Sequence, residues 1–187
     1  MTGAELSRKA VHVGLSIVAA AVVAVLEPIA AATVLAAATT VALTVELARR
    51  LSPAVARTFG RLSGLLKPRE TTGLTGATLL SAGFTVTAVL FPGAPAVAGI
   101  LFAGLADPAA AVVGRTYGTL RYAGGKSVAG SGTFLVVVLV LGLGLGLGPG
   151  AAILASTVLT AVEALTLPID DNLYLPAAGA GLMVLVV

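Results

Sequence analysis

Several acidic residues and a histidine stand in this sequence among mostly apolar neighbours. Asp107 and Glu163 lie inside long apolar stretches, His12 lies at the start of another, and Asp170 and Asp171 shortly precede the last one. A charged side chain at the centre of a membrane costs about 2.5–3.5 kcal/mol on insertion scales, so it normally faces other helices or a watery cavity. We therefore expect these side chains to line one polar cavity, with buried polar contacts between helices as the alternative.

The N-terminal segment places four polar residues on one face of a helix. Glu5, Arg8, Lys9 and His12 follow i, i+3, i+4 and i+7 spacing, and residues at these spacings are neighbours on a helix surface. We expect this face to meet the membrane at the level of the acids. A signal for membrane orientation would also account for Arg8 and Lys9.

A glycine-rich basic loop follows the fourth apolar stretch. Residues 115–132 read RTYGTLRYAGGKSVAGSG and contain Gly125, Lys126 and Ser127. A Walker A loop would need a preceding strand and a glycine where Leu120 stands, so this loop is not one. Glycines nevertheless let backbone N–H groups approach phosphate oxygens, whose charge Lys and Arg neutralise. The loop is a candidate phosphate-binding segment, with a flexible loop on the basic side of a membrane as the alternative.

Acids beside a basic glycine-rich loop suit Mg²⁺–nucleotide chemistry. Magnesium prefers carboxylate oxygens together with phosphate oxygens. Phosphoryl transfer depends mainly on positioning and on neutralisation of charge. The chain has no cysteine, which excludes disulfides, iron–sulfur clusters and thiolate zinc sites.

The composition requires that the elements carrying these residues lie in lipid. Of the 187 residues, 58% are hydrophobic and 10% are charged, and the mean hydropathy is +1.07. A water-soluble protein of this size could not bury so much apolar surface, and a disordered chain or a nucleic-acid-binding arm is also excluded. The isoelectric point near 9.7 therefore indicates membrane orientation rather than a nucleic-acid partner.

The sequence predicts an all-α polytopic transmembrane bundle of about seven spans, with residues 1–187 forming a single domain. Its apolar stretches cover residues 10–26, 29–45, 77–91, 96–113, 133–147, 151–167 and 173–187. Open sheets leave backbone groups unpaired in lipid, so these stretches are predicted to be helices. We expect the first helix to be retained, Asp107-Pro108 to break the fourth, and the glycines of the LGLGLGLG run at 141–148 to pack tightly within the fifth.

The basic residues predict the side of the membrane that each loop faces. All 11 Lys and Arg residues fall before the first stretch, between the second and third, or between the fourth and fifth. By the positive-inside rule, the N-terminus and the polar cavity face the cytoplasm and the C-terminus lies outside. Residues 49–66 combine arginines with apolar residues at helical spacing and are expected to form an interfacial helix, with a plain linker as the alternative.

Four stretches together carry a family resemblance. They are E-x-x-R-K-x-x-H at residues 5–12, Glu70 with Gly76-Ala77-Thr78, Asp107-Pro108 through Gly114-Arg115 and Gly118 to Lys126-Ser127 and Gly130-Ser131, and Glu163-Ala164 with Asp170-Asp171-Asn172 and Pro176. In this order they resemble the polyprenol kinase family of dolichol kinases, phytol kinases and CTP-dependent diacylglycerol kinases. The resemblance spans nearly the whole chain.

The resemblance implies a CTP-dependent kinase that uses Mg²⁺ to phosphorylate a long-chain lipid alcohol, such as dolichol, phytol, another polyprenol or diacylglycerol, which arrives from the bilayer. It implies nucleotide contacts from Arg8, Lys9, Arg115, Gly118, Lys126, Ser127 and Gly130. It implies metal ligands at Asp107, Asp170 and Asp171. It implies catalytic roles for Asp107, Glu163, Asp171 and His12, of which Glu163 or Asp171 would orient or deprotonate the hydroxyl. Glu5, Glu70 and Asn172 complete the implied site.

One position departs from the family pattern. The Glu of K-S-x-E-G-S is Ala129 here, so either a nearby acid substitutes or nucleotide use is altered. A CDP-lipid synthase is the closest alternative, but its C-terminal basic pattern is absent and no Lys or Arg follows Lys126. A transporter is less favoured because inverted repeats are not evident. A non-catalytic membrane scaffold is supported only by Ala129.

Overall fold

The computed structural model describes residues 2–61, 70 and 73–187, and within these ranges the chain is helical. Its α-helices are α1 (Gly3–Val25), α2 (Pro28–Leu51), α3 (Pro53–Arg61), α4 (Gly76–Leu90), α5 (Ala94–Tyr117), α6 (Val128–Gly144), α7 (Pro149–Ala164) and α8 (Asp171–Val186). A short 3-10 helix, η3 (Ala123–Gly125), lies between α5 and α6. Because the described ranges contain no strand, the all-α prediction is confirmed.

Polar caps and prolines determine where the helices begin. Thr75, Ser127 and Asp170 cap α4, α6 and α8, and each side chain accepts a hydrogen bond from a backbone N–H of the first turn. Pro28 and Pro149 occupy the first positions of α2 and α7, where the missing N–H removes no helical hydrogen bond. The local signals that start α4, α6 and α8 therefore also place polar side chains at these helix ends.

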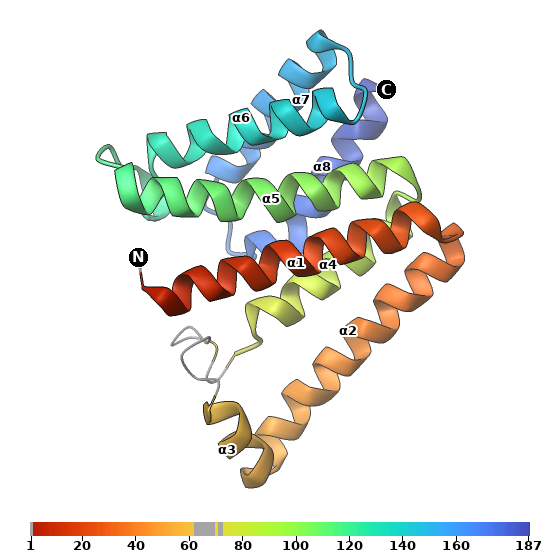
Figure 1. Ribbon diagram of the computed structural model, residues 1–187, viewed down its shortest axis with the longest axis vertical. Helices are drawn as coiled ribbons and strands as arrows, with labels where there is room; N and C mark the ends of the chain where they lie inside the picture. The colour runs from red at the N-terminus through yellow and green to blue at the C-terminus, as the bar shows by residue number, and fades with distance from the viewer. Residues whose placement is uncertain (1, 62–69, 71–72) are drawn as a thin grey trace.

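Helix α5 is the central element of the fold, with α1 beside it on one side and α6 on the other (Figure 1). Buried residues of α5, α6, α7 and α8 form one hydrophobic core, which includes Phe102, Phe134 and Leu159. Residues of α1, α2, α4 and α5 form a second core, which includes Phe84 and Ile100. Because α5 contributes to both cores, it joins the two halves of the bundle.

Glycines allow close backbone contact where α4 and α5 meet α8. A Cβ atom added at Gly99 would lie 2.2 Å from the carbonyl oxygen of Pro176, and one at Gly83 would lie 2.2 Å from that of Asn172. Glycine inside a helix costs about 0.5–1 kcal/mol relative to alanine, but small residues permit the tight helix packing that is typical of membranes. The contact at Gly83 holds the start of α8 against α4.

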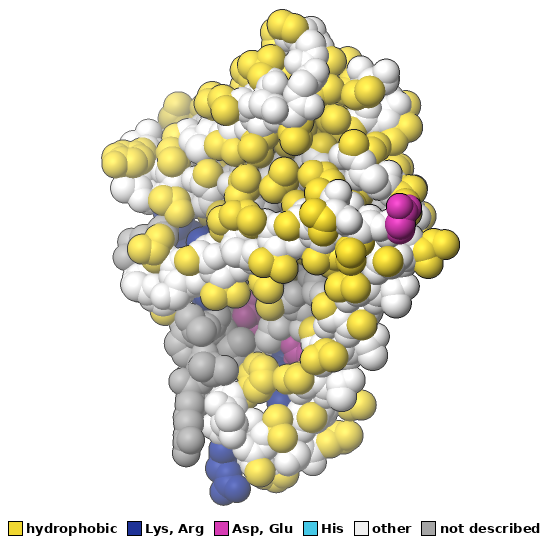
Figure 2. Space-filling view, turned by 45° about the vertical axis from the view of Figure 1, so that its right-hand side comes forward, with side chains coloured by type: hydrophobic (Ala, Val, Ile, Leu, Met, Phe, Trp, Pro, Cys, Tyr) yellow, Lys and Arg dark blue, Asp and Glu magenta, His cyan; other side chains and the backbone are white. Residues whose placement is uncertain are grey.

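The helices support membrane association. Among the described residues, α1, α2 and α5 are long and apolar enough to cross a membrane, and α4, α6, α7 and α8 are shorter apolar helices. Hydrophobic side chains cover much of the face shown in Figure 2, and few charged side chains lie on it. Each apolar stretch predicted from the sequence coincides with one of these helices.

The connections between the helices gather at two ends of the molecule. The N-terminus and the α5–α6 connection lie at one end, whereas the α1–α2 and α4–α5 connections and the C-terminus lie toward the other (Figure 1). The connections α1–α2, α4–α5 and α6–α7 contain no Lys or Arg. The charge asymmetry of the sequence is therefore also an asymmetry of the fold.

Two local expectations about the spans are wrong. Helix α5 continues through Asp107 and Pro108 to Tyr117; proline removes one backbone hydrogen bond, but Pro108 is buried and its packing keeps the helix continuous. The glycine run at 141–148 does not lie within one helix, because α6 ends at Gly144 and Gly146 adopts a φ of 90°. Within the run, Gly142 packs against Ala152, whereas Gly144 has no neighbouring atom within 4 Å of an added Cβ.

The expected interfacial helix over residues 49–66 also differs from the structure. Helix α2 extends to Leu51, so Arg49 belongs to α2, where it is buried. Helix α3 begins separately at Pro53, because proline donates no backbone hydrogen bond that could continue α2. Residues 62–66 of the expected helix lie outside the described residues.

Candidate functional site

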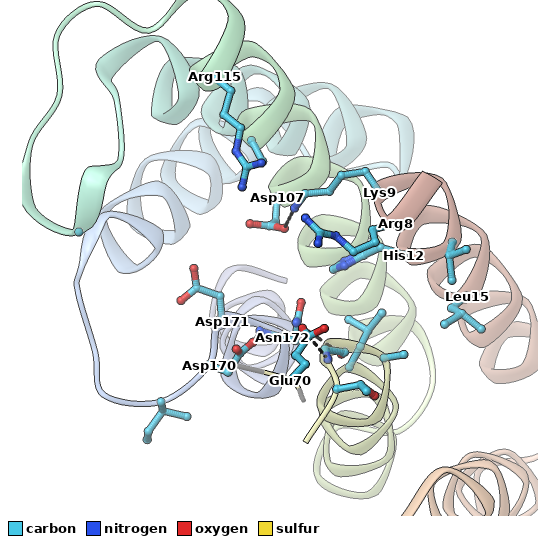
Figure 3. Close-up of a pocket in the computed structure, with 18 of the residues that line it drawn as sticks. Arg8, Lys9, His12, Leu15, Glu70, Asp107, Arg115, Asp170, Asp171 and Asn172 are labelled. Carbon is cyan, nitrogen blue, oxygen red and sulfur yellow. Dashed lines mark hydrogen bonds and ion pairs between the residues drawn. The ribbon is translucent and has the colours of Figure 1, made fainter. Parts of the chain in front are cut away.

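A pocket of about 620 Å³ lies where α1, α4, α5 and the start of α8 meet. This volume falls within the range of about 300–1,000 Å³ that is typical of small-molecule sites. The predicted site residues that line it are Arg8, Lys9, His12, Glu70, Asp107, Arg115, Asp170, Asp171 and Asn172. Figure 3 shows the α1 and α5 side chains on one side of an open space and the α8 side chains on the other.

An ion pair joins α1 to α5 in the wall of this pocket. Lys9 Nζ lies 2.8 Å from Asp107 Oδ2, and the two side chains are 25% and 23% exposed. The pairing explains how an acid is tolerated well inside a helix that is long and apolar enough to cross a membrane, because such acids are normally paired or face a cavity. The remaining exposure leaves Asp107 accessible from the pocket.

A second acid, Glu5, contacts the guanidinium groups of Arg8 and Arg115 at the pocket. Arg115 donates a hydrogen bond to Glu5, and Arg8 Nη2 lies 4.0 Å from the same carboxylate. The Arg115 side chain is 45% exposed, and exposed ion pairs contribute only about 0–1 kcal/mol to stability. The main consequence of these contacts is therefore that two cationic groups are positioned beside the pocket.

The start of α8 forms the facing wall. Asp170 Oδ1 accepts a hydrogen bond from the backbone N–H of Asn172 at 3.1 Å and so caps the helix. Asp171 accepts hydrogen bonds from Tyr174 Oη at 2.9 Å and from Lys126 Nζ at 3.1 Å. Negative charge is favourable at a helix N-terminus. Helix capping thus accounts for two adjacent acids and places both of them at the pocket.

Glu70 and Asn172 meet at the start of α4. Glu70 Oε1 accepts a hydrogen bond from the backbone N–H of Gly76 at 3.2 Å, and Glu70 is only 4% exposed. Asn172 Nδ2 lies 3.5 Å from the carbonyl oxygen of Gly76. Both side chains therefore contact the same backbone unit, and they bring the start of α8 to the start of α4.

Lys126 connects the end of α7 to the start of α8. Its Nζ lies 2.9 Å from Glu163 Oε1 and 3.1 Å from Asp171 Oδ2. Burial alone would lower the pKa of Lys126, but hydrogen bonding to Glu163 and the nearby charge of Asp171 outweigh burial and raise this pKa above its ordinary value of 10.5. Lys126 is therefore cationic at neutral pH and holds Asp171 in place.

Glu163 lies behind the pocket rather than in its lining. Its side chain is buried, with 6% of the residue exposed, and Oε2 accepts a hydrogen bond from Ser131 Oγ at 3.0 Å. Lys126 occupies its other carboxylate oxygen. Of the two acids expected to act on a hydroxyl group, only Asp171 borders the pocket.

The expected phosphate-loop residues Gly118, Ser127 and Gly130 pack together away from the pocket lining. Ser127 Oγ caps α6 by accepting a hydrogen bond from the backbone N–H of Gly130 at 3.1 Å. A Cβ atom added at Gly118 would lie 2.4 Å from Ser127 Oγ. These residues therefore shape the α5–α6 connection, and from that connection the described pocket lining includes Gly124.

The carboxylates at the pocket provide the hard oxygen ligands that Mg²⁺ prefers. In the described part of the chain, no three His, Asp or Glu residues are gathered as a ready metal site; Asp107 and Asp171 instead lie across the pocket from each other (Figure 3). Magnesium is commonly held by one or two protein carboxylates, with substrate phosphates and water completing its shell. A magnesium ion at this pocket would therefore have one or two protein carboxylates and would need phosphate oxygens and water to complete its shell.

A buried ion pair that was not predicted from the sequence lies next to the pocket. Glu46 and Arg49 are 3% and 9% exposed, and Arg49 Nε lies 2.5 Å from Glu46 Oε2. Glu46 Oε1 accepts hydrogen bonds from the backbone N–H of Thr75 at 2.8 Å and from Thr78 Oγ1 at 3.1 Å. The i, i+3 spacing of an acid and a base at the end of an apolar stretch was the available signal.

No known protein-family model, no curated protein and no solved structure matches this chain.

Proposed function

We propose that this protein is an integral-membrane kinase that transfers the γ-phosphoryl group of CTP to a long-chain lipid alcohol. One observation carries the proposal: residues from both ends of the chain meet in one pocket that contains both basic and acidic side chains. The four family-like stretches of the sequence support the same reaction, since each contributes to this pocket or to the contacts behind it.

In this proposal, the bases of α1 and α5 bind the nucleotide phosphates. Arg8 and Arg115 offer guanidinium groups, which bind phosphate oxygens through paired hydrogen bonds, and Lys9 adds a further charge. Asp107 and Asp170 provide oxygen ligands for Mg²⁺. When bound, this ion neutralises phosphate charge during transfer.

Asp171 is the residue that we assign to the lipid hydroxyl. Its carboxylate accepts the hydroxyl hydrogen bond and finally the proton, while the alcohol oxygen bonds to the γ-phosphorus and the bond from that phosphorus to the bridging oxygen breaks to leave CDP. The contacts of Asp171 with Lys126 and Tyr174 hold its carboxylate in one orientation. Orientation is sufficient because phosphoryl transfer requires little deprotonation before the transition state.

We assign to Glu163 the role of the family glutamate that is replaced by Ala129 in this sequence. It contacts Lys126 and Ser131, which flank Ala129 in the sequence. In this position its negative charge balances the positive charge of Lys126, and its side chain does not contact the substrates.

The finer membrane topology belongs to the same proposal. All seven apolar helices cross the bilayer, the N-terminus is cytoplasmic and the C-terminus lies outside. The pocket then opens toward the cytoplasm, where nucleotides are available. The absence of Lys and Arg from the connections α1–α2, α4–α5 and α6–α7 supports this orientation, as the positive-inside rule requires.

A product assay tests the proposed reaction. Protein in lipid nanodiscs is incubated with Mg²⁺, CTP or ATP labelled on the γ-phosphate, and either a panel of lipid alcohols or, in parallel reactions, the corresponding lipid monophosphates. We expect labelled lipid monophosphate and unlabelled CDP. Pyrophosphate together with a CDP-lipid would instead assign a CDP-lipid synthase, and the absence of product with every alcohol and both nucleotides would contradict the proposal.

A further inference from the structure

The pocket changes from charged to apolar along α1. Arg8, His12 and Leu15 all line it, and their spacing of four and three residues places them on one face of the helix. Leu15 lies about 10 Å further along the axis than Arg8, at a rise of 1.5 Å per residue. In Figure 3, Leu15 lies beyond His12, away from the acids of α8.

Helix α4 shows the same change in polarity. Gly76 lies at its polar start beside Glu70, and Leu80 lines the pocket one turn further along. Leu80 is 1% exposed and belongs to the core that also contains Ala19 and Phe84. The pocket is therefore closed at its apolar end, where this core joins α1 to α4.

The side of the pocket along α1 is open. Val11 and Leu15 line the pocket, yet they are 51% and 42% exposed. Residues that both line a pocket and remain exposed stand at its rim. The part of the rim on α1 is apolar and lies on a helix that is long and apolar enough to cross a membrane, so this part borders lipid hydrocarbon rather than water.

We infer that the pocket has a lateral opening at Val11 and Leu15, through which the hydrocarbon chain of a bound lipid alcohol leaves the protein. The hydroxyl end lies among the charged residues, the first part of the chain lies against Leu80, and the rest of the chain remains in the bilayer. That the bound lipid is an alcohol rests on the proposed function. The path of its hydrocarbon chain is inferred separately, from the shape and polarity of the pocket.

The size of the pocket supports a path that leads outward. A volume of about 620 Å³ is typical of sites for drug-sized ligands, so it cannot enclose a nucleotide together with a whole polyprenyl chain. Most of such a chain must therefore lie outside the protein. The added length would stay among lipid tails of the same polarity, so lengthening the chain should leave the KM, measured as mole fraction in the bilayer, nearly unchanged.

Single tryptophans can report the position of the chain without any assay of catalysis. The protein has no tryptophan, so Leu15→Trp and Val11→Trp place one fluorophore at the rim. Ile17→Trp is the control matched to Leu15→Trp, because Ile17 is 51% exposed and lies at nearly the same depth as Leu15 but on the opposite face of α1. Each variant in nanodiscs is titrated with dibrominated octadecanol, whose bromine atoms quench tryptophan on contact.

We expect quenching that saturates in at least one rim variant and that unbrominated polyprenol reverses by competition. The Ile17→Trp variant should show only the gradual quenching caused by partition of the alcohol into the bilayer. Gradual, non-competable quenching in both rim variants would overturn the inference, as would a KM that rises sharply beyond a particular chain length. Saturable quenching without any phosphorylated product would retain the lipid site and reject the kinase, whereas product without saturable quenching would retain the kinase and reject this path.

Discussion

Individual charged side chains of the pocket are held in place by neighbours. Asp107 is paired with Lys9, and Asp171 is bonded to Lys126 and Tyr174. Groups that are fixed before a ligand arrives need no reorganisation when charge develops during a reaction, which is the main source of electrostatic catalysis. These contacts therefore suit a phosphoryl-transfer site.

Replacement of Asp107 tests its role at the pocket. Asp107→Asn keeps the shape of the side chain but removes its charge, so we expect phosphoryl transfer to fall by about a hundredfold or more, as for loss of one preorganised electrostatic contact. The measurement is initial rate against Mg²⁺ concentration. Glu27→Gln, an exposed change in the α1–α2 connection, is the matched control; equal rates for both variants would remove Asp107 from the reaction.

The raised pKa of Lys126 predicts how its contribution to stability depends on pH. A group whose pKa is higher in the folded state stabilises fully below its unfolded value, here about 10.5, and loses this contribution as the pH rises through the folded value. The difference in Tm between the native protein and Lys126→Met should thus be constant near neutral pH and shrink above pH 10.5. Arg121→Met is the control, because arginine keeps its charge in this range; a difference that shrinks already near neutral pH would contradict the raised pKa.

At the scale of elements, a buried clamp ties α2 to the start of α4. Glu46 accepts hydrogen bonds from Thr75 and Thr78, and Arg49 donates to the carbonyl oxygen of Glu70 at 2.8 Å. Glu70 and Thr75 line the pocket. The end of α2 therefore supports a wall of the pocket that it does not itself form.

Removing only one residue of the Glu46–Arg49 pair should strongly destabilise the fold. Removing one partner of a buried ion pair typically costs about 3–5 kcal/mol, because the other charge is left unpaired. We expect Glu46→Gln to lower the thermal midpoint of the detergent-solubilised protein strongly, and Glu46→Gln with Arg49→Met to recover part of the loss. Arg50→Met, an exposed change at the adjacent position, should have little effect; an equal effect of Arg50→Met and Glu46→Gln would refute the clamp.

The close contact between α5 and α8 at Gly99 gives a second test of how the helices pack. Gly99→Ala would place a Cβ atom 2.2 Å from the carbonyl oxygen of Pro176, so α5 and α8 must separate and the thermal midpoint should fall. Gly14→Ala meets no atom within 4 Å, and the gain in helix propensity of about 0.8–1.0 kcal/mol should raise it. The α5–α8 contact would be disproved by equal midpoints of these two variants.

At the scale of the whole molecule, charge divides the fold into two ends. Arg8, Lys9, Arg115, Arg121 and Lys126 lie in or beside the N-terminus and the α5–α6 connection, whereas the described connections at the other end contain no Lys or Arg. Such an arrangement is expected when one end stays on the cytoplasmic side during insertion. The pocket lies at the basic end. The proposed topology and the proposed function therefore both require that this end faces the cytoplasm.

Cysteine labelling can test the seven-span topology directly, because the native chain has no cysteine. In intact cells, a membrane-impermeant maleimide should label Glu27→Cys and Gly148→Cys but reach Thr2→Cys and Arg121→Cys only after permeabilisation. If only α1, α2 and α5 crossed the membrane, position 121 would lie outside and would be labelled in intact cells. That result would reject the seven-span proposal while leaving the helical fold intact.

Local features of the structure follow from the sequence to a large extent. Apolar stretches ended by Glu27-Pro28 or Pro92-Gly93 predict helix ends that the structure confirms within one residue, because helix termination depends on neighbours in the chain, whereas α1 begins at Gly3 rather than at residue 10. The failures at Pro108 and Arg49 share one cause. Buried packing keeps α5 continuous, and partners distant in the sequence hold Arg49 inside, so in both places tertiary contacts overrode the local signal.

Composition and short-range order were enough to predict a membrane association, the helical class and the residue types available for chemistry. Which of those residues share a pocket depends on the packing of the helices. Asp171 borders it, while Glu163 and Ser127 lie behind it, although all three belong to equally suggestive motifs. The physical reason is that side-chain position is set by how helices pack, and close contacts such as Gly83 against Asn172 join segments that the linear sequence leaves far apart.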